Sequence, residues 1–407
     1  MGMDNKYDVI VVGAGPSGSS CASLFALGGA GVLLLDKEKF PRDKVCGDAI
    51  GGKALNVLAK LGVEAELREK GFQRSSGIVF SSPNGTEVEI PLVESKDGMS
   101  AGFVCRRREF DDILFRRAKS ACTVLEGAEV LDLLFEGKRV AGVKARMQDG
   151  SVQEFAANLV VGADGTLSTV ARKAGVFSTN AKHNCSAVRG YYDGVAGLRG
   201  NVEIHFLPEC MPGYFWIFPL SKTEANVGVG MLLSDMFSKK ANLKKVMEAC
   251  MKNPRFAGRF ESARLVGEIG GWNIPLASAR RPCAGNGFVL VGDAASLVDP
   301  FSGEGIGNGM KSASIAVDTL CMIAKNRAAS QEECQSYERA LYQEIGKDVE
   351  SSHMLQKLGK LPFLLDIAIG KAKKSGKLRN ELAGMIASRE AKRQAMDPLF
   401  VLKLLLS

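Results

Sequence analysis

A glycine-rich loop between two apolar runs limits the first part of this chain to one kind of fold. The first run covers residues 9–12, the loop reads GAGPSG from Gly13 to Gly18, and a helix of small residues leads to the second run. In this pattern Gly13 permits the tight turn off the strand, Gly15 lets backbone approach a pyrophosphate, and Gly18 lets the helix pack closely on the sheet. The helix N-terminus favours an anion because of its free N–H groups and its dipole. The sequence therefore predicts a Rossmann-like unit that binds a dinucleotide.

Asp36 ends the second apolar run, about where a ribose hydroxyl of the dinucleotide needs an acceptor. A carboxylate there would repel a 2′-phosphate, so FAD or NAD fits the site and NADP does not. A lone GxGxxG is weak evidence, and the alternative is a glycine-rich turn without a ligand. Strand, loop, helix, strand and acid in this order within about thirty residues are strong evidence for the dinucleotide.

Composition excludes several classes of protein. The chain has 407 residues, enough for two or three domains, and a formal net charge of +8. Its ten cysteines form no CxxC pair, so we expect reduced thiols, no disulfide framework and no metal site. Basic and aromatic residues do not interleave, so we expect no nucleic-acid partner. No apolar signal region precedes the first strand, which favours a cytoplasmic location.

Two later segments repeat the strand-to-helix turn. Residues 159–165 form an apolar run that ends at Asp164, and residues 288–295 form another that contains Asp293 and leads through Gly305 to a long helix over 307–324. The alternative for Asp164 is a tight loop with a capping carboxylate. Asp293 is placed to accept hydrogen bonds from ribityl hydroxyls, and the glycine-rich turn lets backbone N–H groups face a flavin ring. Together, the three turns predict one shared ligand.

Alternating residues later in the chain predict a second sheet. Strand patterns near residues 201–206, 214–219, 225–232 and 264–272 indicate antiparallel strands, and residues 77–80 and 87–91 indicate a hairpin. On the strand 214–219, alternation puts Tyr214, Trp216 and Phe218 on one face. Aromatic residues at this spacing are more often core than binding site, and both interpretations stay open on the pattern alone.

With these motifs in place, the chain resembles the large FAD-dependent superfamily of p-hydroxybenzoate-hydroxylase type. Within it, the chain is most similar to the geranylgeranyl reductases, among them digeranylgeranylglycerophospholipid reductase. The superfamily matches are the three turns above and the Arg-x-x-Phe-Asp run that starts at Arg107. Two motifs narrow the resemblance: residues 40–48, FPRDKVCGD, look like the reductases' flavin-side cysteine loop, and residues 214–219, YFWIFP, look like their Tyr-x-Trp-x-Phe-Pro motif.

The resemblance implies the fold and the residues of the site. It implies an α/β fold, with a Rossmann-like FAD-binding domain of the glutathione-reductase type 2, an inserted antiparallel substrate sheet and a helical C-terminal region. The expected boundaries are 1–75, 100–175 and 276–349 for the FAD domain, 76–99 and 176–275 for the substrate domain, and 350–407 for the C-terminal region. Expected catalytic residues are Cys46, Tyr214 and Trp216, and Tyr214, Trp216 and Phe218 are expected to bind substrate. Expected FAD contacts are Gly13, Gly15, Ser17, Gly18, Asp36, Lys37, Cys46, Gly47, Ala49, Arg107, Val130 (through backbone at the adenine edge), Asp164, Asp293, Gly305 and Ile306.

The expected activity is saturation of C=C bonds in geranylgeranyl chains by hydride from N5 of reduced FAD. Archaeal-type membrane lipid precursors are the first substrate class, and a prenylated quinone or another isoprenoid is the second. The rivals are an aromatic-hydroxylase type of monooxygenase and a prenyl carrier without catalysis. Halogenation is disfavoured because Tyr214 and Phe218 replace the first Trp and the Ile of the halogenases' Trp-x-Trp-x-Ile-Pro. Archaeal enzymes often show Gly-Gly-Gly-Ile where this chain has Gly303-Glu304-Gly305-Ile306.

The remaining expectations concern the electron donor and a contact with a membrane. No second GxGxxG unit between strand and helix is present for a nicotinamide, so the donor is transiently docked NAD(P)H or reduced ferredoxin. Near the C-terminus, lysines flank the apolar residues 361–369, which are too few to span a bilayer. This segment either lies at the inner face of a membrane, meets an acidic protein, or packs on the body as an amphipathic helix. The apolar tail 398–406 is expected to cover a lipid tunnel or touch a membrane.

Overall fold

The computed structural model describes residues 5–91, 102–376 and 379. At its centre β1 (Lys6–Val12) pairs in parallel with β11 (Val152–Gly162) on one side and with β2 (Val32–Asp36) on the other. The strand order is β17-β18-β11-β1-β2-β8, and β9 and β10 extend β11 as an antiparallel ladder. The remaining strands of this sheet are β8 (Thr123–Glu126), β9 (Glu129–Glu136), β10 (Arg139–Arg146), β17 (Ala284–Gly285) and β18 (Phe288–Leu290). The predicted Rossmann-like sheet is confirmed.

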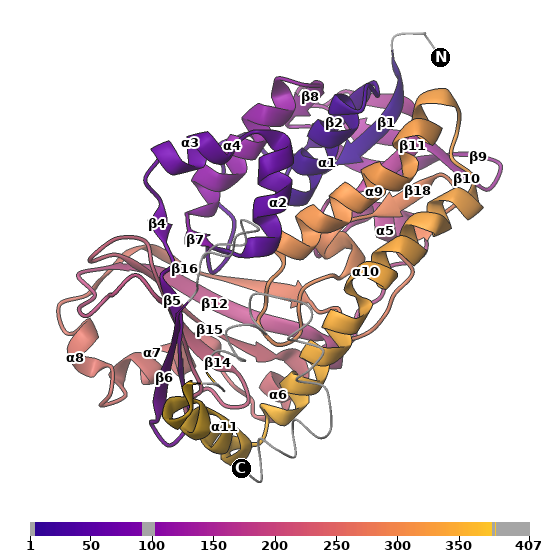
Figure 1. Cartoon of the computed structure of the whole chain (residues 1–407). Coiled ribbons are helices and arrows are strands. Elements are labelled where there is room, and N and C mark those ends of the chain that lie inside the picture. The colour runs from indigo at the N-terminus through magenta and orange to yellow at the C-terminus, as the bar shows by residue number, and fades with distance from the viewer. Residues whose placement is uncertain (1–4, 92–101, 377–378, 380–407) are drawn as a thin grey trace.

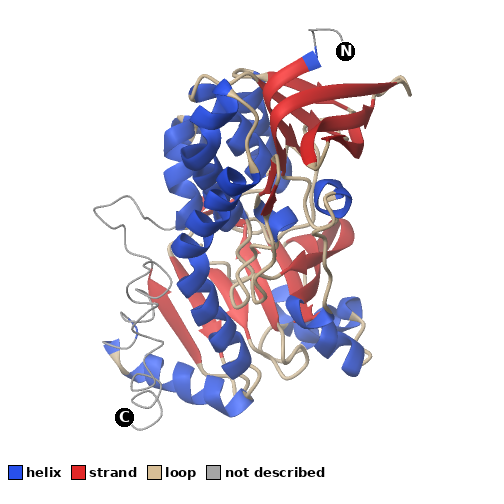
Figure 2. Ribbon diagram, turned by 90° about the vertical axis from the view of Figure 1, so that its right-hand side faces the viewer, coloured by secondary structure: helices blue, strands red, loops and turns tan. Residues whose placement is uncertain are grey.

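Helices pack against this sheet and bury its apolar strands (Figures 1 and 2). Residues 9–11 and 33–35 are fully buried in the core that they share with α1 and α9. The predicted long helix over 307–324 is observed as α9. The helices of this half are α1 (Pro16–Leu27), α2 (Gly52–Leu61), α3 (Glu64–Glu69), α4 (Arg107–Lys119), α5 (Thr169–Lys173), η3 (Gly292–Ala295), α9 (Ile306–Asn326) and α10 (Gln331–Leu358).

A second sheet of seven strands lies below the first in Figure 1, in the order β16-β12-β15-β14-β13-β5-β6. The predicted hairpin of β5 and β6 is confirmed. The expectation of a wholly antiparallel sheet is wrong at one place, because β13 pairs with β5 in parallel. The hairpin comes from an earlier part of the chain and joins the edge of the later strands. The bounds are β5 (Gly77–Ser81), β6 (Glu87–Pro91), β12 (Asn184–Asp193), β13 (Val202–His205), β14 (Tyr214–Pro219), β15 (Ala225–Leu232) and β16 (Arg264–Pro275).

The two faces of β14 divide as its alternation predicts. Phe215 and Ile217 are fully buried in a core that includes Met247 and Cys250 of α7. Trp216 and Phe218 belong to the opposite face, which lies toward the domain of the first sheet, because the position of Gly47 lies against both rings. The elements on the outer side are α6 (Leu233–Ser238), α7 (Leu243–Lys252), α8 (Ala257–Phe260) and η2 (Ala181–His183).

A small third sheet links the two halves. In it β7 (Phe103–Val104) pairs with both β3 (Ala49–Ile50) and β4 (Gln73–Arg74). Farther along the chain, α10 runs without a break through residue 350, where the sequence places a boundary. It is followed by α11 (Pro362–Lys374), which packs on β6 through Leu365 and Ile369. The predicted tail 398–406 lies outside the described residues. Within them, no helix is both long and apolar enough to cross a membrane.

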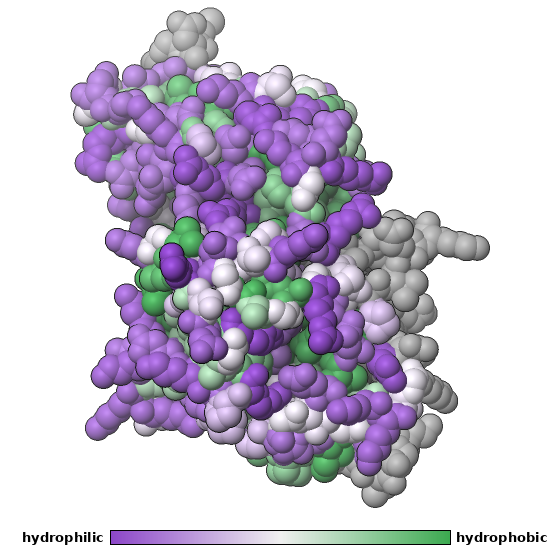
Figure 3. Space-filling view, turned by 90° about the vertical axis from the view of Figure 1, so that its left-hand side faces the viewer, coloured by the Kyte–Doolittle hydropathy of each residue, from purple (hydrophilic) through white to green (hydrophobic). Residues whose placement is uncertain are grey.

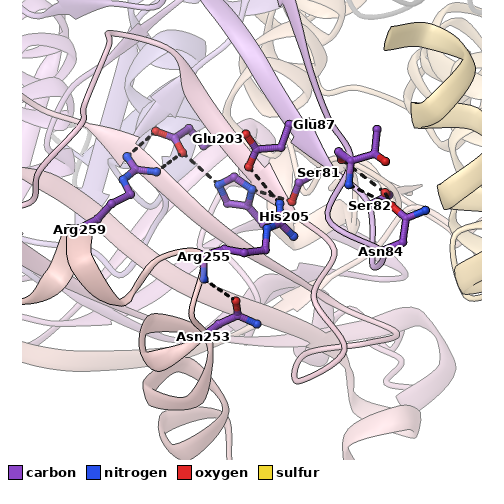
Figure 4. A network of polar contacts seen from close by, with 10 residues as sticks. Ser81, Ser82, Asn84, Glu87, Glu203, His205, Asn253, Arg255 and Arg259 are labelled. Carbon is purple, nitrogen blue, oxygen red and sulfur yellow. Dashed lines mark hydrogen bonds and ion pairs between the residues drawn. The ribbon is translucent and has the colours of Figure 1, made fainter. Parts of the chain in front are cut away.

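A buried polar network fastens the parallel junction of β5 and β13 (Figure 4). The side chain of His205 lies between Ser81, whose Oγ is 2.9 Å from Nδ1, and Glu203, whose Oε2 is 3.1 Å from Nε2. Arg259 of α8 donates to both oxygens of Glu203, at 2.6 and 2.8 Å. Burial raises the pKa of Glu203, but hydrogen bonds from Arg259 and His205 outweigh that effect and lower it. Glu203 therefore stays ionised, and it depends on Arg259 for compensation.

We expect Arg259→Met to reduce the free energy of unfolding by about 2–3 kcal/mol, because it leaves a buried carboxylate without its cation. Glu87→Gln is the matched control, since the ion pair of Glu87 with Arg255 in the same network is more exposed. That change should cost less than about 1 kcal/mol. Urea unfolding at pH 7 measures both. Equal losses in the two variants would contradict the role given to Arg259.

Candidate active site

The carboxyl ends of three parallel strands meet at one edge of the first sheet. The N–H of Ala163 donates to the carbonyl of Val12 at 2.8 Å, and the N–H of Val291 donates to the carbonyl of Gly162 at 2.9 Å. Ligands of open α/β sheets bind in this position, outside the carboxyl ends of the strands. The structure therefore brings together the three turns that the sequence separates by more than a hundred residues.

The glycines of the first loop have distinct roles in packing. Gly13 has a φ of +97°, and a Cβ there would lie 2.5 Å from the carbonyl oxygen of Ala163. A Cβ on Gly18 would overlap the carbonyl oxygen of Gly13, so both positions require glycine. At Gly15, in contrast, a Cβ would meet only the Arg42 guanidinium, at 3.6 Å. The backbone at Gly15 is therefore open on the side that faces a cation.

This cradle fits the pyrophosphate of a dinucleotide. Gly15 is the N-cap of α1 and has no side chain to cap the helix, so it leaves the first N–H groups of α1 open to an anion. Ser17 lies deeper in the cradle, where its Oγ contacts the positions of Gly292 and Gly309 from the third turn. The residues present thus suit FAD, with the α1 terminus and Arg42 toward its phosphates.

Asp36 is buried at the end of β2, 8 % exposed. Its carboxylate accepts from the N–H of Ala14 at 2.6 Å and of Glu38 at 2.8 Å. Burial raises the pKa of Asp36, and these hydrogen bonds partly offset the effect. Neighbouring Lys37 is exposed, and Val130 follows Ala128, whose N–H donates to the carbonyl of Asp36 at 2.9 Å. Asp36 and Val130 therefore lie at the same end of the site, and their contacts with ribose and adenine remain predictions.

Of the three consecutive arginines, Arg107 is the one that points inward. It is 8 % exposed and forms two hydrogen bonds with Asp111, at 2.6 and 2.8 Å. Arg42 reaches the same carboxylate at 2.8 Å. Burial by itself lowers the pKa of Arg107, but Asp111 and the adjacent Cys46 raise it well above its ordinary value. A permanent positive charge therefore stands beside the cysteine. Arg106 instead pairs with Glu224 at the substrate sheet.

The third turn places Asp293 near Gly305, the N-cap of α9. A Cβ on Gly305 would lie 3.5 Å from Oδ1 of Asp293. Burial raises the pKa of Asp293. Ile306 begins α9, whose N-cap again lacks a side-chain hydrogen bond. Glu304, the departure from the archaeal pattern, extends toward α2, and its Oε1 would lie 2.7 Å from a Cβ on Gly51.

Asp164 caps a helix, which is the alternative that the sequence left open for this residue. Its Oδ1 accepts from the hydroxyl of Ser168 at 2.5 Å, and its Oδ2 accepts from the N–H groups of Thr169 at 2.6 Å and Val170 at 3.1 Å. The carboxylate therefore holds the first turn of α5. A direct contact between Asp164 and the dinucleotide remains a prediction.

The cysteine loop and the aromatic strand are joined by one amide side chain. Asn226 of β15 accepts from the indole N–H of Trp216 at 2.9 Å. Its own amide donates to the carbonyl of Cys46 at 2.7 Å and to the carboxylate of Asp48 at 2.8 Å. Trp216 is thereby fixed beside Gly47, where a Cβ would lie 3.1 Å from the Phe218 ring. The predicted substrate and flavin-side motifs meet here.

The aromatic strand also reaches the third turn. The hydroxyl of Tyr214 donates to the carbonyl of Ser302 at 3.0 Å. The rings of Tyr214, Trp216 and Phe218 follow one another with centroids 6.1 Å apart at each step. These three side chains therefore form a wall that extends from the loop around Cys46 to the turn before α9. Ala49 starts β3 just beyond that loop.

The loop itself has unusual electrostatics. Burial raises the pKa of Cys46, and Arg107 only partly offsets the effect, so Cys46 is a neutral thiol near pH 7. Burial also raises the pKa of Asp48 to about 6 and lowers that of Lys44 to about 7. The ammonium of Lys44 lies 3.0 Å from the centroid of the Trp272 ring. Two groups that titrate near neutrality therefore flank the cysteine.

Several of these residues were missed from the sequence. Asp48 has a φ of +67°, and Lys44 lies in the same loop. Both belong to the motif at residues 40–48, but neither of them was assigned a role from the sequence. Trp272 was assigned only to a strand, and its indole N–H donates to Thr166 at 3.2 Å. Arg42 could have been found from the sequence, because a cation near the first loop is expected to face the phosphates. Asn226 had none, because it is one polar residue within a buried strand.

Comparisons with known proteins agree with this site. An FAD binding domain family model matches residues 6–344. Digeranylgeranylglycerophospholipid reductase 2 of Methanococcoides burtonii is 32% identical over 359 residues, which are 86% of this chain and 83% of that protein. Menaquinone reductase of Mycolicibacterium smegmatis is 32% identical over 330 residues, 78% of this chain and 77% of that protein.

Solved structures share the fold. A geranylgeranyl bacteriochlorophyll reductase-like protein from Thermoplasma acidophilum has a TM-score of 0.85 at 24% identity and covers 98% of both chains. The flavin-dependent brominase Bmp2 has a TM-score of 0.79 at 21% identity and covers 97% of this chain and 99% of its own. At these identities the likeness concerns the fold alone.

The fold and the convergent glycine turns define an FAD-dependent oxidoreductase. The chain belongs to the FAD-binding family and, within it, to the geranylgeranyl reductase type of flavoprotein. The predicted FAD and the predicted class of enzyme are confirmed. Among the described residues, no group of three or more His, Cys, Asp or Glu is arranged to hold a metal ion.

We expect Gly18→Ala to abolish or strongly reduce bound flavin, because the new Cβ overlaps the Gly13 carbonyl and displaces the loop. Gly346→Ala is the matched control, since Gly346 is also helical and a Cβ there meets nothing within 4 Å. That change should be neutral or stabilising by up to about 1 kcal/mol. The ratio of flavin to protein absorbance measures both. A Gly18→Ala protein that is fully loaded would contradict the packing argument.

We expect Asp48→Asn to remove one component of the pH dependence of stability. The folded pKa of about 6 lies above the ordinary 3.8, so the stability from this proton is complete below pH 3.8 and is lost as pH rises through 6. One proton corresponds to about 1.4 kcal/mol per pH unit within that window. Asparagine keeps the acceptor for Asn226 and tolerates the positive φ. Denaturant unfolding at several pH values measures the slope. If the free energy of unfolding changes with pH equally in wild type and variant between pH 4 and 6, Asp48 does not contribute this component.

Proposed function

We propose that this protein is an FAD-dependent reductase that saturates C=C bonds in isoprenoid chains. One observation carries the proposal: both polar groups of the aromatic wall are tied to the protein. The indole N–H of Trp216 is bound to Asn226, and the hydroxyl of Tyr214 is bound to the Ser302 carbonyl. The wall therefore presents ring faces and edges next to the cysteine loop. Such a surface suits a hydrocarbon chain and lacks donors to recognise a polar substrate.

The chain's residues supply geometry and charge for this chemistry. Reduced FAD, when bound, would supply the hydride to one carbon of the double bond, and a proton would add to the other carbon. An unactivated alkene has no carbonyl to polarise, so the protein must orient it and exclude water. Ring faces of Tyr214 and Trp216 can meet positive charge that develops on the alkene. We propose that Cys46, a neutral thiol beside Arg107, faces the flavin and shapes the site for the substrate.

The substrate class follows from chemistry shared by the relatives. One relative is named for a digeranylgeranylglycerophospholipid and another for menaquinone, and both are 32% identical to this chain. We propose an isoprenoid lipid, with the archaeal-type phospholipid precursor first and a prenylated quinone second. Tyr214 packs against the apolar cluster that contains Phe206, Met211 and Leu365, which supports a long hydrocarbon substrate. Electrons come from transiently docked NAD(P)H or from reduced ferredoxin.

We expect cells that make the protein to contain isoprenoid lipids or quinones that are heavier by about two mass units for each double bond reduced. Cells with Asn226→Ala, in which Trp216 loses its anchor, should accumulate the unsaturated form. Mass spectrometry of the lipid extract with and without the protein measures this. A gain of one oxygen instead would identify a monooxygenase, and an unchanged lipid profile with colourless purified protein would indicate a carrier.

Cys46→Ser provides the second arm of this experiment. The variant should stay yellow, because serine keeps the size of the Cys46 side chain and leaves the glycine turns and Arg42 of the cradle intact. It should reduce the lipid more slowly or yield a different degree of saturation. An unchanged rate and product would remove Cys46 from the catalytic residues. Phe40→Leu is the matched control in the same loop, since Phe40 packs on Phe115 in a different part of the core.

A further inference from the structure

Two segments at one end of the molecule carry an excess of positive charge. Residues 233–245 and 357–374 contain nine lysines and two aspartates, a net +7 of the +8 of the whole chain. Both aspartates already have partners within the protein. Asp235 forms an ion pair with Lys360 at 2.7 Å, and Asp366 accepts a hydrogen bond from the N–H of Asn84 at 2.9 Å. The pair between Asp235 and Lys360 also shows that α6 lies against the junction of α10 and α11. Figure 1 places this junction at the end of the molecule opposite the N-terminus.

Large apolar side chains are exposed at the same place. Phe237 of α6 is 61% exposed, Phe363 of α11 is 58% exposed, and Leu361 between α10 and α11 is 44% exposed. Lys239 and Lys240 follow Phe237, and Lys357 precedes Leu361 in the chain. Figure 3 shows apolar residues among hydrophilic ones at the lower end of the face that it presents. We call the set Phe237, Leu361 and Phe363 with its flanking lysines the lysine-flanked end.

An apolar column leads from the lysine-flanked end to the aromatic wall. Leu365 and Ile369 of α11 are buried in a cluster with Val88 and Ile90 of β6, together with Phe206 and Met211. The ring of Phe206 lies 6.4 Å from that of Tyr214 and 6.4 Å from that of Phe301. Helix α11 therefore covers the apolar residues that lie behind Tyr214, and its first turn, with Phe363, is exposed.

We propose that the lysine-flanked end docks on the surface of an anionic lipid bilayer. Its lysines meet the headgroups, and Phe237, Leu361 and Phe363 enter the boundary with the acyl chains. An acidic protein would satisfy the lysines but would leave three large apolar side chains without a reason to be exposed. The choice of partner rests on the proposed function, because a lipid substrate resides in such a bilayer. Docking by this end places α11, and the column beneath it, next to the source of that lipid.

The test is sedimentation of the FAD-loaded protein with vesicles of phosphatidylglycerol and phosphatidylcholine, compared with phosphatidylcholine alone. Wild type should sediment with the anionic vesicles, and 0.5 M salt should release most of it. Phe237→Ser with Phe363→Ser should weaken the partition coefficient at least tenfold. Lys240→Gln with Lys357→Gln should weaken it roughly fivefold for each lysine. Equal binding to neutral and anionic vesicles, or no loss in either double variant, would overturn the proposal.

Controls come from the other end of the molecule. Met322→Ser removes an apolar side chain that is 67% exposed, and Lys138→Gln removes an exposed lysine from the turn between β9 and β10. Neither should change vesicle binding. Each variant must keep the flavin content and unfolding midpoint of wild type. Salt-dependent binding to an acidic ferredoxin without any vesicle binding would also overturn the proposal.

The experiments distinguish a failure of the docking proposal from a failure of the proposed function. A protein that reduces an isoprenoid dispersed in detergent but binds no vesicles would reject the docking alone. A protein that binds anionic vesicles through these residues but leaves every isoprenoid unchanged would reject the proposed function alone. The vesicle measurement needs no turnover.

Discussion

Close backbone packing at Gly13 and Gly18 is the constraint on which the site depends. Neither position has room for a Cβ, since one faces the Ala163 carbonyl and the other the Gly13 carbonyl. This contact sets the distance between α1 and the parallel strands. It also brings Ser17 against Gly292 and Gly309, so the first loop fixes the third turn. The close packing of this one loop thereby aligns segments of the chain almost three hundred residues apart around one dinucleotide.

The site also depends on the link between the two sheets, which Asn226 provides. Asn226 uses both atoms of its amide, one toward Trp216 and the other toward the Cys46 loop. The amide lies at the interface of a cofactor loop and a substrate strand, where a charged side chain would carry a desolvation cost. Asp48 does bear that cost, as its raised pKa indicates. The neutral amide therefore holds the loop and the wall together without adding a second buried charge.

The parts that sequence predicts are those in which local chemistry decides the structure. The order of strand, glycine loop, helix and acid up to Asp36 identifies β1, α1 and β2, and the alternation in residues 214–219 identifies the two faces of β14. Both patterns depend on neighbours in the chain. The same is true of the hairpin of β5 and β6, whose existence the sequence predicts correctly.

What the sequence misses depends on partners that are distant in the chain. The parallel pairing of β5 with β13 joins residues more than a hundred positions apart, and nothing in either strand specifies its neighbour. Asn226 meets Cys46 across 180 residues, and Lys44 meets Trp272 across an even longer separation. Asp164 shows the opposite case, because its capping role is local and the sequence already contained it as an alternative.

The likeness to a brominase shows why the site must decide the chemistry. The two proteins share a fold, and one fold can host unrelated reactions, so the fold alone leaves the substrate open. In this chain the polar atoms of Tyr214 and Trp216 are bound internally, and the column behind Tyr214 is apolar. A polar substrate would meet a wall whose two donors are already occupied and would lose much of its hydration without compensation. A hydrocarbon chain loses nothing in that exchange, and this asymmetry favours an isoprenoid over an aromatic acid or a halide acceptor.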